Sequence, residues 1–268
     1  MEALAQVESW DAGAVAVAVL RGSDVIAQHG PAEREYRWAS ITKPATALAT
    51  LVAAEEGVVD LDEPAGPEGS TVRHLLAHAS GLPFHGDRPI ARPGTRRIYS
   101  NTGFDRLAAH VERAAEIHFA EYLRRAVFEP LGMRAELRGS AGADVHGTLD
   151  DLVALARELR SPSLVAQETL DEMTSVQFPG LNGVLPDVGR FDPNDWGLGV
   201  ELRDAKQPHW TGTRNSDRTF GHFGGSGTFL WIDPAVGLAC ACLSEREFGP
   251  WALEVWPRLS DAVLAEAA

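Results

Sequence analysis

A serine and a lysine stand three residues apart near the start of the chain, as Ser40 and Lys43. Residues at this spacing share one face of a helix, and Pro44 places the start of that helix close to Ser40. An amine that is partly removed from water has a lowered pKa and can accept the proton of a neighbouring hydroxyl. Ser40 and Lys43 can therefore act as a serine nucleophile and its base. The same pattern also arises by chance at helix starts.

The position at a helix start suits a serine nucleophile for a second reason. The first backbone N–H groups of a helix lack partners within the helix, and the macrodipole is positive there. Both features stabilise an oxyanion. The chain has only two lysines, Lys43 and Lys206, and an arginine could not act as the base because its guanidinium keeps its proton.

A second candidate group is formed by Tyr99 and Asn101, in a loop before a predicted helix over residues 102–116. A phenol beside a cationic amine loses its proton more readily and can act as a base. Asn101 offers a donor and an acceptor to a substrate amide or to Lys43. The alternative is structural: the tyrosine packs in the core and the asparagine caps the helix.

Glycines cluster in a third segment, residues 221–227. Consecutive glycines at the start of a strand indicate a close approach of the backbone to another strand or to a ligand. Ser226 does not fit the G-x-S-x-G pattern of a nucleophile elbow, because Thr228 occupies its last position. A dinucleotide fingerprint fails at Leu230, where a third glycine belongs. The structural alternative is a tight β-corner.

In this order, the three groups resemble the motifs of the class C β-lactamase, D,D-peptidase and esterase superfamily. Members of that superfamily carry S-x-x-K at a helix start, Y-x-N in a loop and K/H-x-G on a strand. The matching residues here are Ser40 and Lys43, Tyr99 and Asn101, and His222 and Gly224. Residues 75–82, 128–133, 197–199 and 230–234 are also similar to that superfamily, so the resemblance covers almost the whole chain.

The resemblance implies an enzyme that forms an acyl-enzyme. Ser40 would attack a carbonyl carbon while Lys43 and Tyr99 move the proton, and the backbone N–H groups of Ser40 and Gly225 would form the oxyanion hole. The substrate site would be completed by Asn101, His222, Phe223 and Gly224. No metal or organic cofactor is implied. His74 and His78 have the i, i+4 spacing of metal ligands, but no third ligand is evident, and surface or turn-capping roles are favoured.

Two residues depart from the penicillin-recognising members of the superfamily. His222 stands where those members carry a lysine, so a permanent charge is replaced by a titratable one. Phe223 replaces a threonine or serine that helps to hold the substrate carboxylate. We therefore expect a carboxylesterase on small acyl esters. The alternatives are a β-lactamase, a D,D-peptidase or D-amino-acid amidase, and a binding module of the same fold that has lost turnover.

The pattern of apolar residues predicts strands at both ends of the chain and helices between them. Helices are predicted over residues 2–10, 40–56, 72–78, 102–116, 119–128, 149–159, 163–174 and 250–266, the last kinked at Pro257. Strands are predicted over residues 14–20, 25–29, 197–202, 227–232 and 236–243, and residues 178–195 are expected to form a loop. This order favours an α+β fold with an antiparallel sheet. The resemblance adds helices that flank the sheet and a mainly helical lobe beside it.

We expect one catalytic domain over residues 1–268, with an α/β part at about 1–60 and 195–268 and a helical part at about 61–194. The net charge of −14 and the pI near 5.0 argue against nucleic acids and anionic membranes as partners. A small acyl compound is the expected partner. The N-terminal residues do not resemble a signal peptide, which is typical of a cytoplasmic protein. Cys240 and Cys242 are expected to share one face of a strand as core residues.

Overall fold

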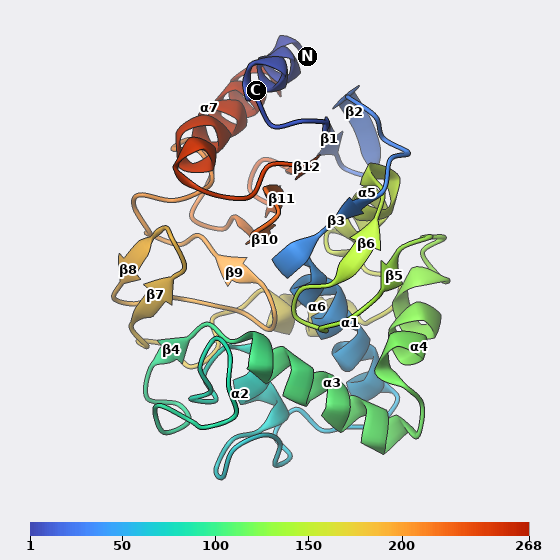
Figure 1. The fold of residues 1–268 in the computed structure, drawn as a ribbon, viewed down its shortest axis with the longest axis vertical. Coiled ribbons are helices and arrows are strands. Elements are labelled where there is room, and N and C mark those ends of the chain that lie inside the picture. Colours follow the sequence, from blue (N-terminus) through green and yellow to red (C-terminus); the bar gives the residue numbers. More distant parts are fainter. Residues whose placement is uncertain (268) are drawn as a thin grey trace.

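A six-stranded antiparallel sheet forms the upper part of the computed structural model, which describes residues 1–267 (Figure 1). Its strands, in spatial order, are β2 (Asp24–His29), β1 (Val15–Arg21), β12 (Leu238–Ser244), β11 (Thr228–Asp233), β10 (Phe220–Gly224) and β9 (Glu201–Leu202). The predicted hairpin of the first two strands is therefore extended by the last strand of the chain, and Val19 of β1 pairs with Cys240 of β12.

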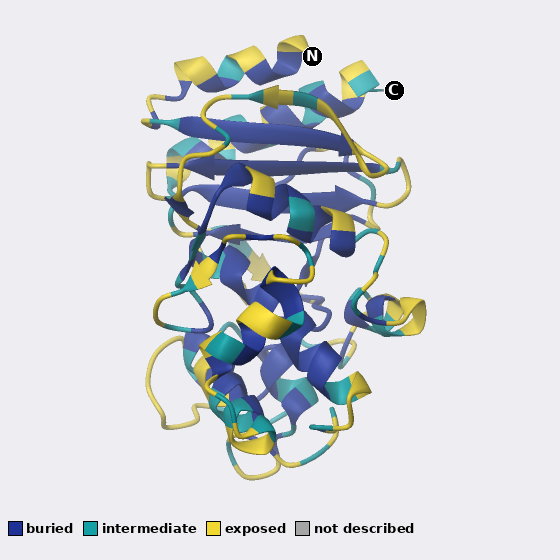
Figure 2. Cartoon of the chain, turned by 90° about the vertical axis from the view of Figure 1, so that its right-hand side faces the viewer, coloured by how far each residue is buried: buried dark blue, intermediate teal, exposed yellow. Residues whose placement is uncertain are grey.

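Different helices cover the two faces of this sheet. They are η1 (Glu2–Ser9) and α7 (Pro250–Ala267) on one face, and α5 (Leu149–Glu158) with α1 (Thr42–Glu55) below it on the other (Figures 1 and 2). Successive side chains of a strand point to opposite faces, so each strand serves two apolar cores. In β1, Ala18 belongs to the larger core with α1 and α5, whereas Val19 belongs to the smaller core with Trp256 of α7.

The smaller core contains both cysteines. Cys240 and Cys242 are fully buried, unpaired and on the same face of β12, opposite Val19 and Val17 of β1. Their predicted role as small core residues is confirmed. We call this smaller cluster, which also includes Trp231 and Trp256, the terminal core.

α1 is the central helix of the lower half of the molecule. Its residues from Thr42 to Ala53 are all buried, which agrees with a sequence that has no charged side chain between Lys43 and Glu55. Around it lie α2 (Val72–Leu76), α3 (Asn101–Ala115), α4 (Phe119–Leu123), a π-helical turn η3 (Arg124–Phe128) and α6 (Gln167–Met173). The sheet flanked by helices and the helical lobe confirm the predicted α+β class.

Two small sheets connect the main sheet to the helical part. One contains β3 (Tyr36–Arg37), β6 (Val145–Gly147) and β5 (Glu136–Leu137), and the other contains β4 (Arg97–Ile98), β7 (Gly183–Leu185) and β8 (Gly189–Phe191). The prediction of a loop over residues 178–195 was therefore wrong. β7 and β8 are too short to show a period in the sequence, and β7 is held by a parallel pairing with the distant β4.

Two predicted boundaries also differ from the structure. The predicted strand 197–202 is reduced to β9, because Gly197 N donates to Val200 O at 3.0 Å and Gly199 has a positive φ of 76°, so the chain turns there. The helix predicted from Ser40 begins as a 3₁₀ turn, η2 (Ala39–Ile41), and becomes α-helical at Thr42. Within residues 1–267, no helix combines the length and apolar character that crossing a bilayer requires.

Candidate active site

Ser40 lies in η2, immediately before α1, and is half-buried. The preceding residue, Ala39, has a φ of 48°, in the left-handed region that residues with a Cβ rarely adopt. This strained turn is held from the side by β10, because Gly224 has no room for a Cβ: Trp38 O would lie 2.4 Å from it. The serine is thus presented on a tight turn next to a strand that carries other predicted site residues.

The Lys43 amine is in contact with Ser40 and two further oxygens. Nζ lies 3.3 Å from Ser40 Oγ, 2.6 Å from Asn101 Oδ1 and 2.7 Å from Gly142 O. A neutral amine has two N–H donors and one lone pair. Asn101 Oδ1 and Gly142 O, at the two shorter distances, can accept both N–H groups of a neutral amine. Its lone pair then remains for the Ser40 hydroxyl proton. The Gly142 carbonyl was not foreseen from the sequence.

Burial holds the pKa of the Lys43 ammonium well below its usual value of 10.5, and the negative charge of Asp105 opposes this only in part. The side chain is fully buried, and within residues 1–267 no carboxylate forms a salt bridge with it. The other lysine, Lys206, is also buried, but its Nζ lies 2.5 Å from Glu201 Oε1. Unlike Lys206, Lys43 therefore has no carboxylate partner among the described residues that would stabilise its charged form.

Tyr99 points its phenol toward the same place. Its hydroxyl lies 3.4 Å from His222 Nε2, and its ring centroid lies 4.6 Å from Lys43 Nζ. Burial raises the pKa of Tyr99 above its usual value, and a hydrogen bond with the Ser40 side chain lowers it only in part. This corrects the expectation that a nearby cationic amine would favour the phenolate. Because burial disfavours the charged phenolate, Tyr99 keeps its proton and can pass it on.

His222 is buried on β10 and is neutral. Burial is the largest cause that lowers the pKa of its imidazole, to about 3. Its Nδ1 donates a hydrogen bond to Phe223 O at 2.6 Å, so Nε2 is the acceptor that faces the Tyr99 hydroxyl. At neutral pH, His222 therefore brings no positive charge to the site.

Asn101 lies where the sequence placed it, but it does not cap the helix. It is the first residue of α3, and the cap is Ser100, whose hydroxyl accepts from Gly103 N at 2.8 Å. The Asn101 side chain is free to orient Lys43 instead.

The segment after His222 only partly matches the expected substrate site. Phe223 turns away from it into the terminal core, where its ring centroid lies 4.6 Å from that of Phe248. This follows from the alternation of side chains along β10. Gly224 serves the close contact with η2 described above. Gly225 is exposed, with open space where a side chain would stand, so a ligand can approach its backbone.

The surface or turn-capping role favoured from the sequence was wrong for His78, which is buried directly beneath the site. Its ring centroid is 4.4 Å from that of Tyr99 and 4.7 Å from that of Trp196, and its Nδ1 accepts from Ser100 N at 3.1 Å. His78 thereby fixes the backbone next to Tyr99. Its positive φ of 54° takes it out of α2, and no residue spacing in the sequence signals such a turn. His74, by contrast, contacts Thr71 Oγ1 at the helix start, the capping role expected for it.

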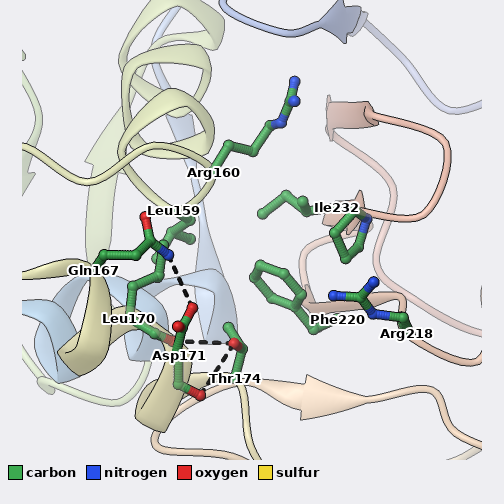
Figure 3. A pocket seen from close by; sticks show the side chains of 10 residues that line it. Leu159, Arg160, Gln167, Leu170, Asp171, Thr174, Arg218, Phe220 and Ile232 are labelled. Atoms are coloured by element: carbon green, nitrogen blue, oxygen red, sulfur yellow. Dashed lines mark hydrogen bonds between the residues drawn. The ribbon is translucent and has the colours of Figure 1, made fainter.

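Two cavities of similar size differ in their relation to this site. One, of about 380 Å³, lies between α6, the end of α5 and the strands β10 and β11 (Figure 3). Leu170 lines its helical side and Phe220 its strand side, and none of the predicted site residues lines it. The other, of about 480 Å³, is lined in part by Tyr99 and therefore adjoins the candidate site.

Known proteins are similar to this chain in sequence and in fold. The sequence profile of the Beta-lactamase family matches residues 5–136 and 134–265. Penicillin-binding protein 4* of Bacillus subtilis is 25% identical over 197 residues, which are 59% of this chain and 44% of that protein. The chain thus spans less than half the length of the curated relatives it matches.

Solved structures extend the similarity to the whole chain. The crystal structure of a beta-lactamase from Mycobacterium bovis is 54% identical, with a TM-score of 0.97 and 99% of each chain covered. EstCE1, a hydrolase with promiscuous acyltransferase activity, has the same fold at 18% identity, with a TM-score of 0.80 over 97% of this chain and 96% of that one. The chain therefore belongs to the beta-lactamase family of serine hydrolases.

Proposed function

We propose that this protein is a carboxylesterase that forms an acyl-enzyme on Ser40 and acts on small acyl esters. The observation that carries the catalytic part is the environment of Lys43, whose buried Nζ contacts Ser40 Oγ, Asn101 Oδ1 and Gly142 O and whose pKa is lowered by burial. This is the arrangement required to activate a hydroxyl at neutral pH.

The reaction follows from these positions. Lys43 takes the proton of Ser40 as the serine oxygen attacks the carbonyl carbon, and the oxyanion is stabilised by the backbone N–H groups of Ser40 and Gly225. The proton then passes by way of Tyr99 to the leaving alcohol, whose bond to the carbonyl breaks. In the second half, a water molecule gives its proton to the same pair and attacks the acyl-enzyme, which releases the acid and restores Ser40.

The preference for esters rests on what faces the substrate from β10. His222 is neutral, since its pKa is lowered to about 3. Phe223 has no hydroxyl, and its ring lies in the terminal core. A β-lactam carboxylate placed beside this strand would meet neither a positive charge nor a hydroxyl from these two residues, and an unpaired buried carboxylate is strongly disfavoured.

Two other functions have specific support. The 54% identical protein from Mycobacterium bovis is described as a beta-lactamase, which favours β-lactam hydrolysis. The similarity to penicillin-binding protein 4* favours a D,D-peptidase or D-amino-acid amidase. A binding module without turnover is the remaining alternative. The contact between Lys43 and Ser40 argues against it, because a protein that only binds has no need of an activated hydroxyl.

Ser40 is expected to be the only residue that a fluorophosphonate probe labels, because it alone combines a base with an oxyanion site. Peptide mapping by mass spectrometry after labelling tests this. The Ser40→Ala protein is the control and should remain unlabelled. A label on Ser80 or Ser226, with Ser40 unmodified, would show that the nucleophile has been assigned wrongly.

Short esters are expected to be hydrolysed far better than β-lactams, by roughly 10²-fold or more in kcat/KM, since a site that leaves a buried charge unpaired rejects the ligand by this order. The measurement compares p-nitrophenyl butyrate with nitrocefin and benzylpenicillin, and the Ser40→Ala protein supplies the background rate. Hydrolysis of benzylpenicillin as efficient as that of the best ester would make β-lactamase the correct function.

A further inference from the structure

The cavity of about 480 Å³ beside Tyr99 has walls that are largely apolar. It is lined by residues of the paired strands β4 and β7, among them the partners Ile98 and Val184, and by Phe84. The rings of Phe84 and Tyr99 are stacked at a centroid distance of 5.8 Å. Val184 and Phe84 remain 54% and 44% exposed. Apolar surface of this extent next to a catalytic group can bind an apolar part of a substrate.

The charged residues of this cavity are mostly arginines. Arg96 and Arg190 are exposed at its rim, and neither forms a salt bridge with a carboxylate of residues 1–267. Arg96 Nη2 contacts only Ile90 O, at 3.5 Å. Asp187 is the single carboxylate in the lining. The rim therefore carries an excess of positive charge in a chain whose net charge is −14.

A third arginine, Arg97, lines the cavity from a buried position and adds to this positive charge. The Arg97 guanidinium is buried and donates to the carbonyl oxygens of Ala77, Gln177 and Asn194 at 2.5, 2.7 and 3.1 Å. None of these partners is a carboxylate. Burial lowers the pKa of Arg97 to about 10, which leaves it charged at neutral pH, and Asp195 opposes this shift only in part. Its positive charge is thus only partly compensated at the base of the cavity.

We infer that this cavity binds a carboxylate that the substrate carries on an apolar body, with the body between Phe84 and Val184 and the carboxylate on Arg96 and Arg190. Guanidinium groups pair with carboxylates through two parallel hydrogen bonds. This inference rests on the proposed ester hydrolysis by Ser40 and adds the substrate class: esters with an anionic group on the Tyr99 side. The anionic group can belong to the acyl part or to the leaving alcohol, and the experiment separates these two sources.

Binding is measured first, without turnover, on the Ser40→Ala protein by isothermal titration with 4-phenylbutyrate and its neutral amide. The carboxylate is expected to bind roughly 10- to 100-fold more tightly than the amide, the usual effect of a charged hydrogen-bonded pair. Arg190→Gln or Arg96→Gln should remove most of this difference. Arg88→Gln is the matched control, an exposed arginine of the same loop that does not line the cavity. Equal affinities for the two ligands, or an equal loss in Arg88→Gln, would overturn the inference.

Turnover is then measured on two matched ester pairs. p-Nitrophenyl hydrogen glutarate and its monoamide test the acyl side, and 3-acetoxybenzoate and 3-acetoxybenzamide test the leaving-group side. One pair is expected to show a preference in kcat/KM for the acid of roughly 10- to 100-fold, which Arg190→Gln abolishes. If both pairs react at equal rates, the inference fails while the esterase function stands. If no ester of either kind is hydrolysed, the proposed function fails, and the binding result is judged separately.

Discussion

Replacing Lys43 by arginine is expected to lower kcat for ester hydrolysis by roughly 10²–10⁴, about as much as replacing it by alanine. Lys43 acts through a neutral amine whose N–H groups bond to Asn101 Oδ1 and Gly142 O. The guanidinium of an arginine carries the same charge as a lysine ammonium, but it does not give up its proton and so cannot act as the base. The measurement is steady-state hydrolysis of p-nitrophenyl butyrate, with thermal unfolding to confirm that each variant is folded. Lys206→Arg is the control, because Lys206 pairs with Glu201 and has no contact with Ser40 among the described hydrogen bonds.

The pH dependence tests the same role independently. Burial lowers the pKa of Lys43 well below 10.5, so the active, neutral form is favoured at lower pH than for an exposed lysine. kcat/KM should fall as the pH drops through this lowered pKa and should be flat above it. A rate that kept rising tenfold per pH unit toward pH 10.5, the usual value for a lysine, would show that the amine is protonated at neutral pH. Near-normal turnover by Lys43→Arg would also contradict the proposed role.

Replacing Tyr99 by phenylalanine is also expected to lower kcat by roughly 10²–10⁴, the range of a positioned acid–base group. The hydroxyl lies between Ser40 and His222 Nε2, and its raised pKa keeps its proton available for the leaving alcohol. The substitution removes only this oxygen and preserves the ring that packs on His78 and Trp196. Esters with a poor leaving group, such as ethyl butyrate, should therefore lose more activity than p-nitrophenyl esters.

The double variant shows whether the two residues act as one unit. If Lys43 and Tyr99 share one proton-transfer path, Lys43→Ala combined with Tyr99→Phe should lose much less than the product of the two single effects. Fully multiplicative losses would mean that the residues act in separate steps. His222→Gln tests the acceptor on the other side of the phenol: because His222 is neutral already, the pH profile should keep its position even if kcat falls.

The residues of the candidate site could be found from the sequence because their chemistry is rare and local. Ser40 and Lys43 are one helical turn apart, and one of only two lysines in the chain stands there. The apolar helix after them and the hairpin before them were also predicted from the sequence. By contrast, the direction of Phe223 depended on the alternation of β10, a strand whose bounds the apolar pattern did not show. Its place in the terminal core could not be foreseen from a comparison of motifs.

Other parts of the site depend on contacts between distant segments. The Gly142 carbonyl reaches Lys43 only because residue 142 packs on Asn101, where a Cβ would lie 3.3 Å from Asn101 Cα. β7 pairs on one side with the nearby β8 and on the other with β4, which is far away in the sequence. His78 leaves its helix through a positive φ that no local residue type requires. Each of these features is decided by tertiary packing, which no short window of sequence contains.

The pairing of β1 with β12 also determines the order in which the protein can form during synthesis. Val19 is bonded on one side to Ala27, which follows it closely, and on the other to Cys240, from which almost the whole chain separates it. A nascent chain therefore leaves the ribosome with one edge of an apolar strand open until residues 238–244 have been made. Such edges are sites of mispairing between chains. The sheet that positions β10 beside Ser40 is thus completed only after residues 238–244 have been made, and slow, non-local closure is the cost of this topology.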